Sequence, residues 1–330
     1  MEDGGEVVKT ISRVGRGSLT PRCPAEVSIR YAVRSRGVLL ESTPGPQAVM
    51  ISGGGSAPRV FPAAVESAIC TMTEGEKATI ELRGGLSSDD AAMQYEVELC
   101  SWMDVVDVLG DGTILVKPIC TPMPSGDKPR DIDMVRIRYC GRVLGGSSEV
   151  FVNEGFGPSW CDGPDADVVL RKLQLRKIEP EGLRVALRQA WQGCSFLVEL
   201  EPERAFGTSD VSVSGCVIPA ASRVEFKAEL CELSTVEDLS GDGGILLETL
   251  SEPADVAAAV RPMEGSTCCV TYQSAVQGDG PQAGRQFESY HERFVCIGQV
   301  DSPLTDGLER ALQAMIKGQA CIVKVCMPKF

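Results

Sequence analysis

The sequence predicts an α+β protein made of tandem units, each an antiparallel sheet packed around one short helix. Three observations predict this class. A block of sequence occurs three times, each block holds strand-like runs of alternating apolar residues, and each holds one apolar stripe at helical spacing. The 330 residues are enough for two or three domains with separate cores.

Each block begins with an acidic-glycine turn and a short apolar run. A strand of alternating apolar and polar residues follows and contains a tyrosine. The aspartate and tyrosine positions are Asp3 and Tyr31, Asp111 and Tyr139, and Asp242 and Tyr272. The separations of 28, 28 and 30 residues are too similar for coincidence. Repeats of this length are domains in tandem rather than turns of a solenoid. We therefore predict units at residues 1–107, 108–238 and 239–330.

One amphipathic helix follows in each unit, with apolar residues at i, i+3, i+4 and i+7. The stripes run from Val65 to Met72, from Leu183 to Ala190 and from Leu308 to Met315. A proline precedes or opens each helix, and a glycine suited to a left-handed turn follows it. These residues are Pro62 and Gly75, Pro180 and Gly193, and Pro303 and Gly318.

A strand is predicted after each of these glycines, and a further strand closes the first two units. The first set is Ala78–Leu82, Ser195–Leu200 and Ala320–Cys326, and the closing strands are Tyr95–Ser101 and Val224–Leu233. The third unit reaches Phe330 without a closing strand, so we expect it to be C-terminally incomplete, with an open sheet edge. The first unit is shortened, because its loop between the last two strands is about a dozen residues shorter than that of the second.

Composition excludes several classes of function. The chain has 46 acidic and 32 basic residues and a net charge of −14, which argues against a nucleic-acid partner or an anionic membrane surface. The single histidine, His291, excludes a site with two histidine ligands, and we expect no metal and no cofactor. No apolar run is long enough to span a bilayer, and no signal peptide is visible. Fourteen scattered cysteines without framework spacing favour reduced thiols, so we expect a cytoplasmic protein, with nuclear entry left open.

Several segments resemble the FKBP-type peptidyl-prolyl cis-trans isomerase (rotamase) domain. They are Gly182–Gly193, Gly307–Gly318, Pro202–Gly207, Ile218–Ala220 and Val224–Phe226. With acidic linkers after the first two units, the order of units is similar to that of the large multi-domain FKBP-type immunophilins. The resemblance implies half-barrel sheets wrapped around a helix, a role in protein folding, and proline-containing protein clients. No 34-residue helical repeat is present, so chaperone docking is not predicted within these residues.

Residue by residue, the resemblance assigns a prolyl pocket to the second unit, which is the most complete. The pocket-lining positions are Tyr139, Phe151, Phe206, Ile218 and Phe226. Three residues depart from the family pattern. Val152 replaces an aspartate of the pocket, Leu183 replaces the tryptophan that forms the bottom of the pocket, and Phe206 replaces a hydrogen-bonding tyrosine. The alternative is that these side chains only fill a half-barrel core.

The other units are assigned lesser roles by the same resemblance. Further substrate-binding positions are Leu183 in the second unit and Tyr272, Phe287, Glu288 and Leu308 in the third. The first unit keeps Tyr31 and an acidic residue, Glu41, but Val65 occupies the position of the pocket tryptophan. We therefore expect this unit to be a catalytically inactive spacer.

The chemistry of such a pocket needs no nucleophile, because it consists of binding a twisted X-Pro amide more tightly than the planar one. The family resemblance implies isomerase activity on protein clients, which the three departures reduce, together with weak binding of macrolide immunosuppressants. The alternative function is a non-catalytic chaperone or scaffold that binds proteins through degenerate FKBP domains.

Overall fold

The computed structural model describes residues 6–51, 60–83, 93–120, 126–145, 149–160, 162–253, 260–278, 281–299 and 305–326. Its contacts divide the chain into two compact bodies. The N-terminal body comprises residues 1–129, 136–173 and 177–232, and the C-terminal body comprises residues 130–135, 174–176 and 233–330. The three sequence units are called the first, second and third repeats. Two short strands, Val106–Asp107 and Val236–Asp238, precede the predicted boundaries but pair with the sheets of the second and third repeats, and they are counted with those repeats.

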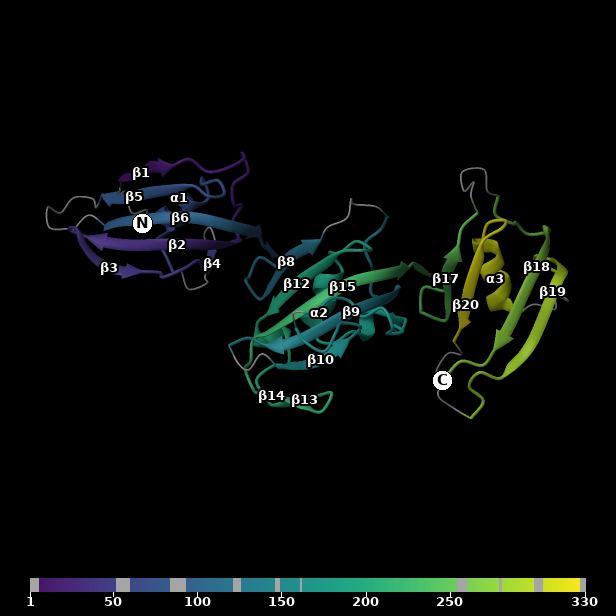
Figure 1. Ribbon diagram of the computed structural model, residues 1–330. Helices are drawn as coiled ribbons and strands as arrows, with labels where there is room; N and C mark the ends of the chain where they lie inside the picture. Colours follow the sequence, from purple (N-terminus) through teal and green to yellow (C-terminus); the bar gives the residue numbers. More distant parts are fainter. Residues whose placement is uncertain are drawn as a thin grey trace. The chain divides into compact units, whose positions relative to one another are not determined.

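The first repeat forms a six-stranded sheet that packs on one helix (Figure 1). The strand order is β1-β5-β6-β2-β3, and β4 also pairs with β2. The bounds are β1 Glu6–Arg13, β2 Ala25–Ser35, β3 Val38–Ser42, β4 Gln47–Ile51, β5 Lys77–Arg83, β6 Met93–Asp104 and α1 Ala63–Ile69. Alternate residues of β2 and β6 are buried together with one face of α1, as the period-two and helical patterns require.

The second repeat forms a seven-stranded sheet in the order β10-β9-β15-β12-β8-β7, with β11 paired to β9. Its strands are β7 Val106–Asp107, β8 Ile114–Cys120, β9 Met134–Val143, β10 Val150–Glu154, β11 Leu173–Gln174, β12 Ser195–Leu200 and β15 Val224–Ser234. A small hairpin, β13 Val211–Val213 and β14 Cys216–Ile218, lies in the loop before β15. The helices are the 3-10 turn η1 Leu175–Lys177, α2 Glu181–Leu187 and the 3-10 turn η2 Pro202–Arg204.

The third repeat, in the C-terminal body, forms two separate sheets within the described residues. One has the order β16-β17-β20, and the other is the hairpin β18-β19. The bounds are β16 Val236–Asp238, β17 Ile245–Ser251, β18 Thr267–Ala275, β19 Gln286–Cys296, β20 Ala320–Val325 and α3 Asp306–Ala314. The predicted α+β class with antiparallel sheets is confirmed, since all strand pairings with a described register are antiparallel.

The helices are shorter than their apolar stripes predict. α1 ends at Ile69 and α2 at Leu187, although Met72 and Ala190 are also buried. The reason is that the last turn tightens: Met72 N–H donates to the carbonyl of Ile69, three residues back, at 2.9 Å. The glycines that follow, Gly75, Gly193 and Gly318, have positive φ as predicted. The third helix begins after Thr305, which caps it, while Pro303 lies outside the described residues.

Two loops with the same hydrogen-bond pattern come before β8 and β17. In the first, the carboxylate of Asp107 accepts the amides of Gly110 and Gly112 at 2.9 and 2.8 Å. In the second, Asp238 accepts the amides of Gly241 and Gly243 at the same two distances. One aspartate thus determines the shape of each acidic-glycine loop.

No helix among the described residues is long and apolar enough to cross a membrane.

Candidate functional site

Four aromatic side chains form a cluster in the second repeat, on β9, β10, β15 and the loop after η2. Phe151 lies between Phe206 and Phe226, with ring centroids 5.8 and 5.6 Å apart and rings nearly perpendicular. Tyr139 is 6.4 Å from Phe226. Edge-to-face contacts of this kind are favourable beyond the area they bury. The structure therefore brings together four of the five predicted pocket residues in one aromatic cluster.

A β-bulge positions Phe151 at the centre of this cluster. Val150 pairs with Arg142 and Val152 pairs with Gly141, so Phe151 is the extra residue in β10. Bulges turn a side chain away from the regular alternation, and they occur often beside binding sites. Phe226 needs no such device, because it alternates with Ala228 and Leu230 along the buried face of β15.

Gly141 on β9 allows the two phenylalanine rings to approach the backbone. A Cβ atom at this position would lie 2.6 Å from Cζ of Phe151 and 2.7 Å from Cε1 of Phe226. The rings therefore occupy the space that any larger side chain at position 141 needs. No sequence pattern predicts this role for Gly141; the only signal is a glycine two positions after the strand tyrosine.

The cluster has a packed interior and a partly open side. Within the cluster, Phe151 and Phe226 are buried, whereas Tyr139 and Phe206 are half-buried. Ile218 on β14 and Leu183 on α2 are buried as well. Burial, and then the negative charge of Glu154, raises the pKa of Tyr139. Leu183, which stands where the family has a tryptophan, is a fully buried aliphatic residue. Tyr139 and Phe206 are the members that a ligand can reach.

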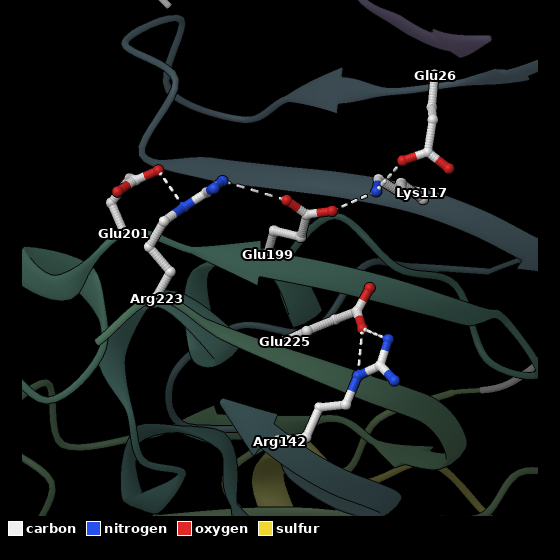
Figure 2. Close-up of polar contacts among 7 residues, drawn as sticks. All are labelled: Glu26, Lys117, Arg142, Glu199, Glu201, Arg223 and Glu225. Atoms are coloured by element: carbon white, nitrogen blue, oxygen red, sulfur yellow. Dashed lines mark hydrogen bonds and ion pairs between the residues drawn. The ribbon is translucent and has the colours of Figure 1, made fainter. Parts of the chain in front are cut away.

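A charged corner lies beside the cluster, where β9 and β15 run next to each other. Arg142 donates to Oε2 of Glu225 from Nε at 2.8 Å and from Nη2 at 2.5 Å (Figure 2). Its guanidinium carbon also lies 4.2 Å from the centroid of the Trp160 ring. Glu225 is buried, and the two charge-assisted hydrogen bonds to its Oε2 offset part of the cost of removing the carboxylate from water. Val152, at the family's aspartate position, contributes no charge here.

A second polar network crosses β8 and β12 (Figure 2). Lys117 on β8 is buried and pairs with Glu199 and, at 2.5 Å, with Glu26 of β2. Glu199 also pairs with Arg223 at 3.3 Å, and Arg223 pairs with Glu201 at 2.8 Å. Burial alone would lower the pKa of Lys117, but the two carboxylates outweigh it and raise the pKa. All members are paired, so we interpret this network as structural.

The first repeat keeps a polar pair instead of a large aromatic cluster. The hydroxyl of Tyr31 donates to Oε1 of Glu41 at 2.6 Å. This hydrogen bond, the burial of the ring and the charge of Glu41 raise the pKa of Tyr31 to about 12. The ring of Tyr31 lies 4.9 Å from Phe61, which lies 6.2 Å from Tyr95. Val65 is fully buried on α1.

The third repeat places its four predicted residues in different environments. Tyr272 and Leu308 pack against one small core of Val295, Ile297 and Leu312. Phe287 is 62% exposed and lies outside that core, while Glu288 is half-buried on β19 opposite Ser274. The described structure thus joins Tyr272 to Leu308 but does not place Phe287 with them.

Among the described residues, no three histidine, cysteine, aspartate or glutamate side chains gather in an arrangement that could hold a metal ion.

Comparisons with known proteins agree with this fold. No family model matches the chain. The peptidyl-prolyl cis-trans isomerase PASTICCINO1 of Arabidopsis thaliana is 26% identical over 250 residues, which is 71% of this chain and 37% of that protein. The three FKBP domains of wheat FKBP73 superpose with a TM-score of 0.51 at 22% identity, covering 69% of this chain and 94% of theirs. The chain is therefore similar in sequence to an FKBP-type isomerase over most of its length, and its fold is that of tandem FKBP domains.

The second repeat has the arrangement of an FKBP domain, an antiparallel sheet whose strands β8 and β12 contact α2. The chain spans just over a third of the length of the PASTICCINO1 relative that it matches.

Proposed function

We propose that the second repeat binds X-Pro segments of protein clients at its aromatic cluster and accelerates their cis-trans isomerisation. The observation that carries the proposal is the perpendicular packing of Phe151 against Phe206 and Phe226, with Tyr139 and Phe206 half-open to solvent. Homology to FKBP-type isomerases supports the reaction type. Clients rich in exposed proline, in the cytoplasm, are the partners that this proposal implies.

The physical mechanism needs only an apolar surface of this kind. Rotation about an X-Pro bond removes the amide resonance, and the twisted amide is less polar than the planar one. An aromatic surface that strips water from the carbonyl therefore favours the twisted form and lowers the barrier. No proton transfer is involved, so the single histidine of the chain does not limit the reaction.

The same geometry accounts for a reduced rate. Phe206 has no hydroxyl with which to hold the substrate carbonyl, Val152 has no carboxylate, and Leu183 presents a smaller floor than an aromatic ring. Each missing contact would otherwise strengthen as the amide twists, so its loss raises the barrier. We propose activity below that of FKBP domains with a complete pocket, and correspondingly weak binding of macrolide immunosuppressants.

The test is exchange of a proline peptide between its cis and trans forms, followed by NMR with the full chain as catalyst. Phe206→Ala removes a half-buried ring without emptying the core. We expect it to lower the catalysed rate about fivefold, the value of one aromatic contact of about 1 kcal/mol. Phe294→Ala, which removes an exposed ring in the third repeat, is the control and should leave the rate unchanged. Exchange at the uncatalysed rate with the unmodified chain would reject the catalytic proposal.

A further inference from the structure

The first repeat has a cavity of about 590 Å³ on the face of its sheet that is turned away from α1. Its lining includes Arg30 of β2 and Glu98 of β6. These two residues alternate with Ile29 and Leu99, which are fully buried in the core that the sheet forms with α1. The cavity is therefore separate from the core of the first repeat and from the aromatic cluster of the second.

Three arginine side chains line this cavity: Arg13 at the end of β1, Arg16 in the loop that follows, and Arg30. The acidic residues in the same lining are Glu74 and Glu98. The described lining thus carries three positive charges and two negative ones, in a chain whose net charge is −14. A surface of this kind attracts an anionic ligand, against the charge of the protein as a whole.

Glu98 holds two of the three arginines and leaves part of each guanidinium group open. Its Oε1 accepts from Nη2 of Arg13 at 2.7 Å and from Nη1 of Arg30 at 3.4 Å. The Nε of Arg13 donates to the carbonyl of Gly75 at 3.0 Å. The hydrogen bond from Arg13 is the main cause that lowers the pKa of Glu98, so this carboxylate stays charged at neutral pH. Nη1 of Arg13 and Nη2 of Arg30 have no partner in the described structure.

The second repeat has a balanced pair at the corresponding place. Arg138, the counterpart of Arg30, pairs with Glu229, the counterpart of Glu98, at 3.1 Å. Within the described residues Glu229 has one arginine partner, whereas Glu98 has two. The shared carboxylate is therefore a property of the first repeat, and not of the repeated fold.

The backbone fixes Arg16 at the rim of the cavity. The amide of Arg16 donates to the carbonyl of Glu74 at 2.7 Å. Gly15 makes this close approach possible, because a Cβ at this position would lie 2.7 Å from the carbonyl oxygen of Glu74 and would overlap Oγ1 of Thr73. The side chain of Arg16 is exposed, and its guanidinium group has no hydrogen bond or ion pair in the described structure. It is thus available to a ligand.

These three arginines match the chemistry of a phosphoryl group. One guanidinium group can occupy both oxygens of a carboxylate, whereas a phosphoryl group has three acceptor oxygens and a charge of about −1.5 to −2 at pH 7. Arginine is also the side chain that binds such oxygens with two parallel hydrogen bonds. Three partly open guanidinium groups around one cavity therefore favour a phosphoryl group over a carboxylate.

The size and the lining of the cavity favour a polypeptide as the carrier of that group. Cavities that bind organic ligands measure about 300–1,000 Å³, so this one has room for the phosphoryl group and for the residues beside it. Val14 and Pro46 offer apolar contacts to those residues. The described lining has no aromatic side chain on which a nucleotide base could stack.

We propose that the first repeat binds a phosphorylated segment of a polypeptide in this cavity. Arg16 contributes a whole guanidinium group, and Arg13 and Arg30 contribute the donors that Glu98 leaves open. Recognition of phosphorylated motifs by arginine clusters is a general mode of peptide binding. The first repeat thus has a binding role of its own, which does not depend on catalysis by the second repeat.

The test uses the full chain and a fluorescein-labelled peptide that carries one phosphoserine among glycine and alanine residues. We expect saturable binding by fluorescence anisotropy. The same peptide with unmodified serine should bind at least about tenfold more weakly, because the charge-assisted hydrogen bonds are lost. Binding of the phosphopeptide should also weaken as the salt concentration rises from about 0.05 to about 0.3 M, since these arginines lie near solvent.

Two variants in the loop between β1 and β2 give a matched comparison. Arg16→Gln removes the guanidinium group that has no partner and leaves the contacts of Glu98 in place, and it should weaken phosphopeptide binding at least about tenfold. Arg22→Gln removes the same charge from an exposed arginine that is not in the described lining, and it should leave binding unchanged. Both side chains are exposed, so neither substitution disturbs the core.

Several results would overturn the proposal. Three of them are the absence of saturable binding, equal affinity for the phosphoserine and serine peptides, and an equal loss of binding in the two variants. Displacement of the labelled peptide by inorganic phosphate or ADP as readily as by unlabelled phosphopeptide would also overturn it, because the cavity would then recognise a small anion or a nucleotide in place of a polypeptide.

Discussion

Replacement of Gly141 by alanine tests the packing on which the aromatic cluster depends. The new methyl group would lie 2.6 Å from Cζ of Phe151, 2.7 Å from Cε1 of Phe226 and 2.8 Å from Cε2 of Phe151. Carbon atoms in contact normally lie about 3.5–4.0 Å apart, so both rings must move by about 1 Å. Both rings are buried and hold each other edge to face, so neither moves without disturbing the other. Overpacking of this kind costs about 1–3 kcal/mol.

Gly163→Ala is the matched control, because a Cβ at Gly163 meets nothing within 4 Å and its φ is not in the left-handed region. We expect that control to be neutral or to stabilise slightly, by restricting the unfolded chain. A chain with several domains does not unfold in one step, so amide hydrogen exchange resolved by mass spectrometry is the suitable assay.

We expect faster amide exchange in β9, β10 and β15 for Gly141→Ala and unchanged exchange in these strands for Gly163→Ala. Gly141→Ala should also slow prolyl isomerisation, because the ring that it displaces, Phe151, contacts Phe206 directly. Equal exchange in the two variants would show that the rings do not pack over the backbone of β9.

Two further predictions concern polar contacts. Tyr31→Phe removes the hydrogen bond to Glu41 and should cost about 1 kcal/mol at neutral pH, since the exposed Glu41 regains water. The pKa of Tyr31 is about 12 when folded and about 10 when unfolded, so its contribution is fully present below pH ~10 and is lost as the pH rises to ~12. Alkaline unfolding followed by circular dichroism should therefore be less steep in the variant, and an unchanged slope would contradict the assignment. Lys117→Met should destabilise β8 and β12 by about 1–3 kcal/mol, because Glu199 then retains only its ion pair with Arg223. Glu26→Gln should cost less than about 1 kcal/mol. Hydrogen exchange in these strands measures both, and a larger effect of Glu26→Gln would show that Glu26 is the principal partner of Lys117.

Much of each repeat follows from local patterns. The strand Ser195–Leu200 was predicted with the bounds that the structure has, because alternation of apolar residues is a property of the segment itself. The turns after the helices were predicted from glycine alone, since a positive φ at that position favours glycine. The tightened last turns of α1 and α2 were missed because Met72 and Ala190 stay on the buried side even after the helix ends.

The candidate site was harder to predict, because it depends on contacts between distant strands. The residues Tyr139, Phe151, Phe206 and Phe226 were assigned from family resemblance, and no local pattern in the chain places them together. The bulge at Phe151 arises from the register of β10 on β9, and the space at Gly141 arises from two rings of different strands. The ion pairs of Lys117 join strands that are far apart in sequence. Composition and spacing carry no signal for such contacts.

The acidic-glycine loops have a consequence for the chemical lifetime of the protein. Asp-Gly sequences age by attack of the glycine amide on the aspartate side chain, which forms a cyclic imide and then an isoaspartyl linkage. In the loops at Asp111-Gly112 and Asp242-Gly243, the glycine amides are engaged by the carboxylates of Asp107 and Asp238. Hydrogen bonds, first that from the Thr113 hydroxyl, lower the pKa of Asp111 and keep it in the less reactive ionised form. The contacts that shape these loops should therefore also slow their covalent damage.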